Sequence, residues 1–292
     1  MSTPEQSVGI RAKHPAERAL FRALIDDAAV FPPGLAPIQQ AVADHVARQT
    51  NSYEDLVGPL LLPASLIEAF VHREHPRQMN VGLIAGQRAD LALVHDALSR
   101  LRGDSSVNLA GIEIVWSPEW HQAVGWHGAA LSVEVPNSSQ QARALSDIRE
   151  QAGEGNQVRA KFRTGSTPDA PVPTATELAT FIRACVDHDL GFKLTGGLHH
   201  AISQTIPDGE DQFGFLNILA ATYRALAEGA KVPEMTTTLS QRDPKLIVDI
   251  ITRLSGADAT TVRTFFTAYG CCGVLDPIGD LASLRLIKET TV

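Results

Sequence analysis

The segments QVRAKFRTG (157–165) and LGFKLTGG (190–197) give the clearest indication of the fold class. Side chains alternate between the two sides of a strand, so the first segment carries Lys161 and two arginines on one side and apolar residues on the other. The second segment carries Lys193 on one side and Phe and Leu on the other. If helices cover the apolar sides, both lysines face the opposite side of one sheet, which is a pattern expected of an α/β protein.

Similar strand-like runs extend along the chain in both directions. The eight runs are 28–31, 56–63, 79–86, 108–116, 129–136, 157–165, 190–197 and 264–275. Helical spacing occurs at 15–25, 37–48, 64–74, 90–102, 139–153, 175–189 and 213–230. This alternation favours a parallel sheet, and eight strands favour closure into a (β/α)8 TIM-type barrel. A doubly wound open sheet is the alternative, and residues 231–263 receive no clear assignment.

The composition favours one globular domain. Hydrophobic residues make up 44% and charged residues 20% of the 292 residues, so the chain has enough apolar material for a full core. A (β/α) barrel of about 250 residues fits this length. We expect residues 1–14 to form a disordered polar tail and residues 15–292 to form a single barrel domain.

Charge and cysteine content restrict the location and the partners. The net charge of −8 argues against nucleic-acid binding, because no basic stripe offsets it. No apolar run is long enough to span a membrane, and the N-terminus lacks the apolar stretch of a signal peptide. We expect Cys185, Cys271 and Cys272 to be free thiols in a reducing compartment. These features predict a cytoplasmic protein without membrane or nucleic-acid partners, and they are compatible with a homo-oligomer.

Four consecutive strand candidates direct charged side chains toward one space. In a barrel covered by helices, Glu113, Glu134, Lys161 and Lys193 all face the interior. Burying such charges without partners costs several kcal/mol each, so they pair with one another or serve a ligand. A purely structural salt-bridge network, or an antiparallel sheet with one solvated face, is the alternative interpretation.

Polar residues and glycines follow the two lysine strands, at the end of the barrel where active sites of this fold lie. Cationic side chains and glycine turns that expose backbone N–H groups favour an anionic substrate, a carboxylate or a phosphate. The candidate substrate-binding residues here are Arg163, Thr164, Gly165, Thr195, Gly196, Gly197, His199 and His200. The expected partner is therefore a small anionic metabolite.

A lysine at this place has a known chemical use. Its amine is protonated near neutrality, because the ordinary pKa is about 10.4. A second cation or burial lowers that pKa and frees the lone pair to attack a carbonyl carbon. We expect Lys161 and Lys193, at matching heights on neighbouring strands, to depress each other's pKa. Glu113 or Glu134 would then relay protons.

The segments AKFRTGST (160–167) and GFKLTGGLH (191–199) resemble the two lysine strands of deoxyribose-phosphate aldolases. This resemblance implies a class I aldolase in which Lys161 forms the Schiff base and Lys193 perturbs it. AYGCCGVL (268–275) faintly resembles the turn after that family's eighth strand, which implies that Gly270 and Cys271 help to hold a substrate phosphate. Arg163 departs from the family pattern, because a small hydroxyl residue is usual there.

Further departures concern the residues after the second lysine strand. His199 stands where the family has another basic residue, serines are usual in place of the cysteine pair, and no proton-relay aspartate matches clearly. As a whole, the chain resembles an uncharacterised bacterial family of this length through the blocks LIDDAAVFPP (24–33), AKFRTG, FKLTGGLHH and FGFLN (213–217). That second resemblance implies no activity.

Three functions remain open from the sequence. The first is a lyase of the class I aldolase type, which needs no cofactor and no metal. The second is a metal-dependent barrel lyase or hydrolase that uses His199 and His200 with the two glutamates. The third is a non-catalytic barrel that binds an anionic metabolite. Asp26 and Asp27 could enter the site or be helix-end charges, and the Cys271–Cys272 pair has no evident catalytic base in the sequence.

Overall fold

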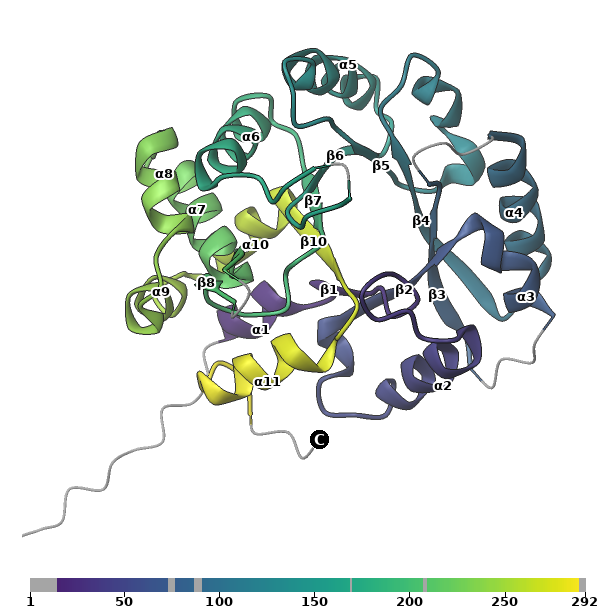
Figure 1. Ribbon diagram of the computed structural model, residues 1–292, viewed down its shortest axis with the longest axis horizontal. Helices are drawn as coiled ribbons and strands as arrows, with labels where there is room; N and C mark the ends of the chain where they lie inside the picture. Colours follow the sequence, from purple (N-terminus) through teal and green to yellow (C-terminus); the bar gives the residue numbers. More distant parts are fainter. Residues whose placement is uncertain (1–14, 73–76, 87–90, 169, 207–208, 289–292) are drawn as a thin grey trace, which may run out of the picture.

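The computed structural model describes residues 15–72, 77–86, 91–168, 170–206 and 209–288. Eight parallel strands close into a barrel in the order β1-β10-β7-β6-β5-β4-β3-β2 (Figure 1). These strands are β1 (Ile25–Asp27), β2 (Val57–Pro63), β3 (Met79–Ile84), β4 (Val107–Val115), β5 (Leu131–Glu134), β6 (Val158–Arg163), β7 (Phe192–Thr195) and β10 (Phe266–Cys271). The predicted (β/α)8 TIM barrel is confirmed.

Helices surround the barrel on its outer side (Figure 1). They are α1 (Pro15–Phe21), α2 (Ile38–Arg48), α3 (Ile67–Val71), α4 (Leu91–Gly103), α5 (Gln141–Gly153), α6 (Ala175–Asp187), α7 (Phe215–Ala227), α8 (Val232–Leu239), α9 (Pro244–Ile251), α10 (Gly256–Phe265) and α11 (Leu275–Ser283). Short 3-10 turns are η1 (Glu54–Leu56), η2 (Ala64–Leu66), η3 (Trp120–Ala123) and η4 (Trp126–Gly128), and β8 (Gln204–Thr205) pairs with β9 (Asp211–Gln212).

The core forms between the apolar side of the strands and the helices, as the alternation of side chains predicts. Phe162 of β6 stacks on Phe181 of α6 with 4.7 Å between the ring centroids. Phe192 of β7 stacks on Phe266 of β10 at 5.4 Å. All four rings are buried, and burying each one contributes about 2 kcal/mol or more. This packing fixes which side of β6 and β7 faces the barrel interior.

The first strand differs from the prediction. The apolar run at 28–31 suggested a strand there, whereas β1 is Ile25–Asp27. Ala28 begins the chain's departure from the barrel, since the Phe31 N–H bonds back to its carbonyl in a turn. The criterion of an apolar run failed because β1 carries two acids, one on each side. Asp27 points outward and is paired with His45 and Arg48 of α2.

Residues 231–263, which had no clear assignment from sequence, form α8, α9 and most of α10. Their caps explain the boundaries: Asp243 accepts from the Lys245 N–H before α9, and Ser255 accepts from the Asp258 N–H before α10. The predicted tail at 1–14 lies outside the described residues. No helix in the described part of the chain is long and apolar enough to cross a membrane. Cys185, Cys271 and Cys272 are free thiols.

Candidate functional site: a buried cluster of lysines and carboxylates

Two lysines and three carboxylates meet inside the barrel. Lys161 Nζ lies 2.8 Å from Glu113 Oε2 and 2.8 Å from Glu134 Oε2. Lys193 Nζ contacts Asp26 Oδ2 and Glu113 Oε1. Glu113 therefore bridges the two ammonium groups. Nearly all of this charge is shielded from solvent, since the side chains of both lysines and Glu113 are at most 7% exposed.

The register of the sheet produces this arrangement. Lys161 is paired with Lys193 across β6 and β7, and with Glu134 across β5 and β6. Glu113 comes from β4, where it is paired with Ser132 of β5. Four strands in sequence therefore each contribute a charged side chain to this cluster, at neighbouring heights in the barrel. The predicted convergence of these four side chains inside the barrel is found.

Asp26 is a member of the cluster that the catalytic assignment from sequence did not include. It lies on β1, which is next to β10 in the closed sheet and so reaches Lys193 from the other side. Room for its carboxylate comes from Gly58 of β2, because a Cβ atom built on Gly58 would lie only 2.0 Å from Asp26 Oδ1. The signal in the sequence is the Asp26–Asp27 pair. Its role stays open there, because the apolar run at 28–31 indicates a strand that begins three residues after Ile25.

The carboxylates keep both lysines protonated. Burial lowers the pKa of Lys161, but the charges of Glu113 and Glu134 outweigh burial, and the net pKa is raised. The same balance, with Asp26 and Glu113 as partners, raises the pKa of Lys193. The expectation that the two lysines depress each other's pKa is therefore wrong. The alternation of side chains along β6 and β7 predicts that the two cations lie side by side, but it does not show that a carboxylate lies between them.

The three carboxylates respond differently to this environment. Burial raises the pKa of Glu113, but Lys161 and Lys193 together lower it to about 2. For Glu134, burial is outweighed by Lys161 and Arg163, and its pKa is lowered. For Asp26, burial prevails over the attraction of Lys193, and its pKa is raised. Asp26 is thus the carboxyl group of the cluster that is most easily protonated.

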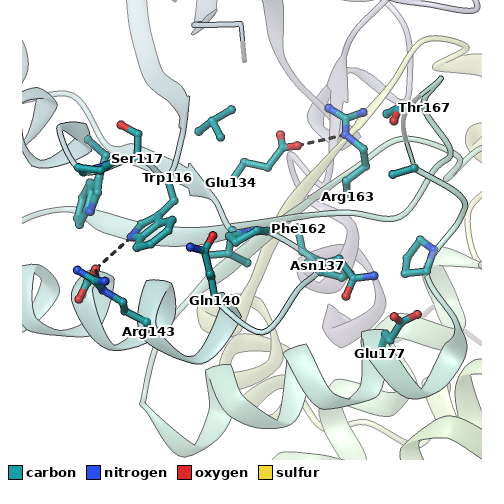
Figure 2. Close-up of a pocket in the computed structure, with 18 of the residues that line it drawn as sticks. Trp116, Ser117, Glu134, Asn137, Gln140, Arg143, Phe162, Arg163, Thr167 and Glu177 are labelled. Carbon is teal, nitrogen blue, oxygen red and sulfur yellow. Dashed lines mark hydrogen bonds and ion pairs between the residues drawn. The ribbon is translucent and has the colours of Figure 1, made fainter. Parts of the chain in front are cut away.

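A cavity of about 950 Å³ opens over the carboxyl ends of β4, β5 and β6. Glu134 and Arg163 lie at one end of it and point toward each other (Figure 2), with Arg163 Nε 3.1 Å from Glu134 Oε1. Thr167 also lies at this end, and Trp116 lies in the opposite part. Gly165 lines the cavity as well. Glu134 contacts both Lys161 and the cavity, so it connects the buried amine with the space open to a ligand.

A second, smaller cavity of about 150 Å³ lies inside the barrel toward the amino ends of the strands. Asp26, Glu113, Lys193 and Arg159 line it. Arg159 precedes Lys161 by two positions on β6 and so faces the same interior. The cluster therefore has a cavity on each side of it. Arg163 lines the cavity at the carboxyl ends of the strands, and Arg159 lines the one toward their amino ends.

The turns after β6 and β7 pack tightly against each other. Thr164 donates its hydroxyl to the Gly196 carbonyl at 2.6 Å, and its N–H to the Thr195 carbonyl at 2.8 Å. A Cβ atom on Gly165 would lie 2.8 Å from the Gly196 carbonyl carbon, so only glycine allows this contact. Gly196 and Gly197 have positive φ angles of 84° and 73°, which glycine adopts without strain. Anion binding by this turn remains a prediction.

The two histidines pair with α11 rather than with the glutamates. His199 Nδ1 lies 2.9 Å from Asp276 Oδ2, and His200 Nδ1 lies 3.3 Å from Asp280 Oδ2. Glu113, in contrast, is fully engaged with the lysines. Within the described ranges, no group of three or more His, Cys, Asp or Glu side chains is arranged to hold a metal ion. The ligand set considered from sequence is therefore not brought together.

The remaining two candidates lie at the end of β10. Gly270 is paired with Thr195 of β7, and a Cβ atom added to it would lie 3.6 Å from the Thr195 hydroxyl oxygen. Cys271 is buried, with its Sγ 3.8 Å from His199 Nδ1. Asp276 and Asp280 were not predicted from sequence, because α11 had no helix assignment and its acids look like ordinary first-turn and surface charges.

The fold and this cluster define a (β/α)8 barrel with a buried lysine–carboxylate centre. No protein-family model matches the chain, and no curated protein matches it either. Among solved structures, the chain is similar to "QR15, an Aldolase", with a TM-score of 0.49 and 12% sequence identity over 92% of this chain and 99% of that chain. This likeness assigns no activity to the present chain, and its barrel fold is established by the strand order alone.

Proposed function

We propose that this protein is a lyase of the class I aldolase type that acts on a small anionic carbonyl compound, with Lys161 as the nucleophile. The observation that carries the proposal is the position of the Lys161 amine between Glu113 and Glu134 and beside Lys193. A lysine within 2.8 Å of two proton acceptors has the partners that imine formation needs. The resemblance of both lysine segments to deoxyribose-phosphate aldolases supports the same role.

The first step is activation of the amine. Lys161 is an ammonium ion at rest, because the carboxylates raise its pKa. Arg163 lowers the pKa of Glu134 and so weakens Glu134 as a base. An anionic substrate in the cavity competes for Arg163, and Glu134 then becomes more basic. Glu134 Oε2 accepts a proton from Lys161 Nζ across 2.8 Å, and the neutral amine is formed when substrate binds.

The second step is covalent chemistry at the carbonyl carbon. The Lys161 lone pair forms a C–N bond while the carbonyl oxygen takes a proton from Glu134, which gives a carbinolamine protonated on nitrogen. One proton then passes from this nitrogen to the hydroxyl oxygen. Loss of this oxygen as water yields an iminium ion. The bond between the α and β carbons then breaks, and its electron pair forms the enamine double bond to the iminium carbon. The Glu134 carboxylate takes the proton of the β-hydroxyl group, so the β carbon leaves as an aldehyde. Protonation of the enamine and hydrolysis release the second product and restore Lys161.

Lys193 and Asp26 have supporting roles in this scheme. Lys193 forms an ion pair with Glu113, whose pKa is lowered to about 2. Glu113 therefore stays negatively charged and stabilises the iminium ion. Asp26 has a raised pKa and contacts Lys193, so it can accept a proton from Lys193. The positive guanidinium of Arg163 would bind the substrate's carboxylate or phosphate at the cavity.

Enamine formation provides the test. The purified protein is incubated in D2O with pyruvate or dihydroxyacetone phosphate, and NMR follows deuterium entering the carbon next to the carbonyl. We expect exchange with wild type and none with Lys161→Arg, which keeps the charge but cannot form an imine. Lys245→Arg, a change of an exposed lysine, is the matched control and should exchange like wild type. Equal exchange by wild type and Lys161→Arg would overturn the proposal in favour of a structural salt-bridge network.

A further inference from the structure

A cysteine, a histidine and an aspartate are aligned at the carboxyl end of β10, apart from the lysine cluster. Cys272 Sγ lies 3.3 Å from His199 Nε2, and the opposite ring nitrogen, Nδ1, lies 2.9 Å from Asp276 Oδ2. The two ring nitrogens thus have different partners. Asp276 fixes the tautomer with hydrogen on Nδ1 and leaves Nε2 to exchange a proton with the thiol.

We propose that Cys272 is a nucleophilic thiol that binds an aldehyde covalently, with His199 as its proton partner and Asp276 as the residue that orients His199. The three residues come from three places in the fold: the end of β10, the segment after β7 and the first turn of α11. A nucleophile, a base and an orienting group within hydrogen-bond reach are the arrangement that activates thiols. This inference does not depend on imine formation at Lys161.

The surroundings of Cys272 stabilise its thiolate form. Burial alone would raise its pKa, but hydrogen bonding to His199 and to the Gly34 backbone outweighs burial, and the pKa is lowered. A Cβ atom on Gly34 would lie 2.9 Å from the Ala29 carbonyl oxygen and 3.1 Å from the Cys272 Cβ. Glycine at this position therefore allows the backbone to approach the sulfur.

The groups facing the thiol differ clearly in character. His199 has a raised pKa, mainly through its hydrogen bonds with the two cysteines, and Asp276 adds to the effect. Cys271 has a raised pKa because it is buried, so it stays a neutral thiol when Cys272 is a thiolate. The neighbouring His200 contacts Asp280. Cys272 is half-buried, and the His199 side chain is 21% exposed, so a small reagent can reach the pair.

The chemistry of these groups favours an aldehyde over an ester or amide as the electrophile. Addition to an aldehyde needs only a thiolate and one proton donor: the S–C bond forms, the carbonyl electron pair moves to oxygen, and His199 Nε2 gives that oxygen a proton. The product is a thiohemiacetal, and nothing leaves. Acyl transfer would also need donors for an oxyanion. The Gly34 backbone donor is directed at the sulfur itself.

The test measures alkylation of Cys272 by iodoacetamide in the full chain, with peptide mass spectrometry to resolve the three cysteines. At pH 6 we expect Cys272 to react several-fold faster than free glutathione, because each unit of pKa lowering gains about threefold in net rate. Cys185, which is buried and has a pKa raised well above the ordinary value, should not react. A Cys272 rate equal to that of glutathione at pH 6 would overturn the proposal.

Variants distinguish activation by His199 from simple exposure. His199→Gln should lower the pH 6 rate of Cys272 to that of an ordinary thiol and move the half-maximal rate to higher pH. Asp276→Asn, on the half-exposed first turn of α11, should lower it by a smaller factor and keeps the test valid if His199→Gln does not fold. His72→Gln, an exposed histidine on another side of the barrel, is the matched control. If Cys272 reacts at the wild-type rate in both His199→Gln and Asp276→Asn, the proposed role of His199 is overturned.

Glycolaldehyde is the probe for the aldehyde. It should slow alkylation of Cys272 in a saturable way, and the slowing should disappear after dialysis, because thiohemiacetals form reversibly. Ethylene glycol, which has the same carbon skeleton without a carbonyl group, should have no effect. The Lys161→Arg variant should be protected like wild type. Fast alkylation without protection by glycolaldehyde would overturn the assignment of an aldehyde.

Discussion

Lys161 lies beside Lys193 in the register of β6 and β7, and both ammonium groups are held by the same carboxylate, that of Glu113. Two cations on neighbouring strands would repel each other without it. A bridging carboxylate turns this repulsion into a network in which each lysine has two acidic partners. The stability of the barrel interior and the chemistry proposed for it therefore depend on the same residue.

Removal of the Glu113 charge should destabilise the protein strongly. In Glu113→Gln, both lysines lose one of their two partners while remaining buried, and we expect a loss of about 3 kcal/mol or more in the free energy of unfolding. Urea unfolding measures this quantity. Glu119→Gln, an exposed glutamate that follows the same strand, is the control and should change it by less than about 0.5 kcal/mol. Equal stability of the two variants would contradict the bridging role.

The lowered pKa of Glu113 also makes the free energy of unfolding depend on pH. The pKa of Glu113 is lowered from 4.5 to about 2 by folding, so its ionised form stabilises the fold above pH 4.5, by roughly 3 kcal/mol. This contribution is lost as the pH falls from 4.5 toward 2. The free energy of unfolding should fall more steeply in that window for wild type than for Glu113→Gln. Parallel curves for the two proteins would show that Glu113 has an ordinary pKa.

A substitution of Gly58 tests the position of the Asp26 carboxylate. In Gly58→Ala, the new methyl group would occupy the place of Asp26 Oδ1 and push this carboxylate away from Lys193. We expect a loss of about 1–3 kcal/mol in stability, measured by thermal or urea unfolding. Gly279→Ala in α11 meets no atom within 4 Å and is the control, which should not destabilise the protein. A neutral Gly58→Ala would mean that Asp26 lies elsewhere.

Arg163 is expected to bind the anionic group of the substrate. The Arg163→Ala variant should bind inorganic phosphate about tenfold more weakly than wild type, as measured by thermal shift over a range of phosphate concentrations. Arg242→Ala removes an exposed arginine paired with Asp211, outside the cavity, and should bind phosphate like wild type. Undiminished binding by Arg163→Ala would place the anion elsewhere.

Side-chain alternation was sufficient to predict the interior of four strands. The apolar residues of β6 and β7 pack outward on helices, so the residues between them had to face inward, as Lys161 and Lys193 do. Alternation is a local property of the chain. It therefore predicts the side on which each residue lies, but not the partner that reaches it from a strand far away in sequence.

The features that sequence analysis missed all depend on such long-range partners. Asp26 reaches Lys193 across 167 positions, and its strand is only three residues long with two charged members, so no apolar run marks it. Asp276 meets His199 across 77 positions on a helix that had no assignment. The direction of the lysine pKa shifts was wrong for the same reason, because it depends on carboxylates contributed by other strands.

Reductive trapping tests the imine at Lys161 most directly. Wild type is incubated with pyruvate or dihydroxyacetone phosphate, sodium borohydride is added, and the modified residue is located by peptide mass spectrometry. We expect the main adduct on Lys161, and we expect it to form faster as the pH rises because the pKa of Lys161 is raised. The adduct should be absent from Lys161→Arg and retained in Lys245→Arg. No adduct with either carbonyl compound, or labelling of Lys161 no faster than of exposed lysines, would contradict imine formation at Lys161.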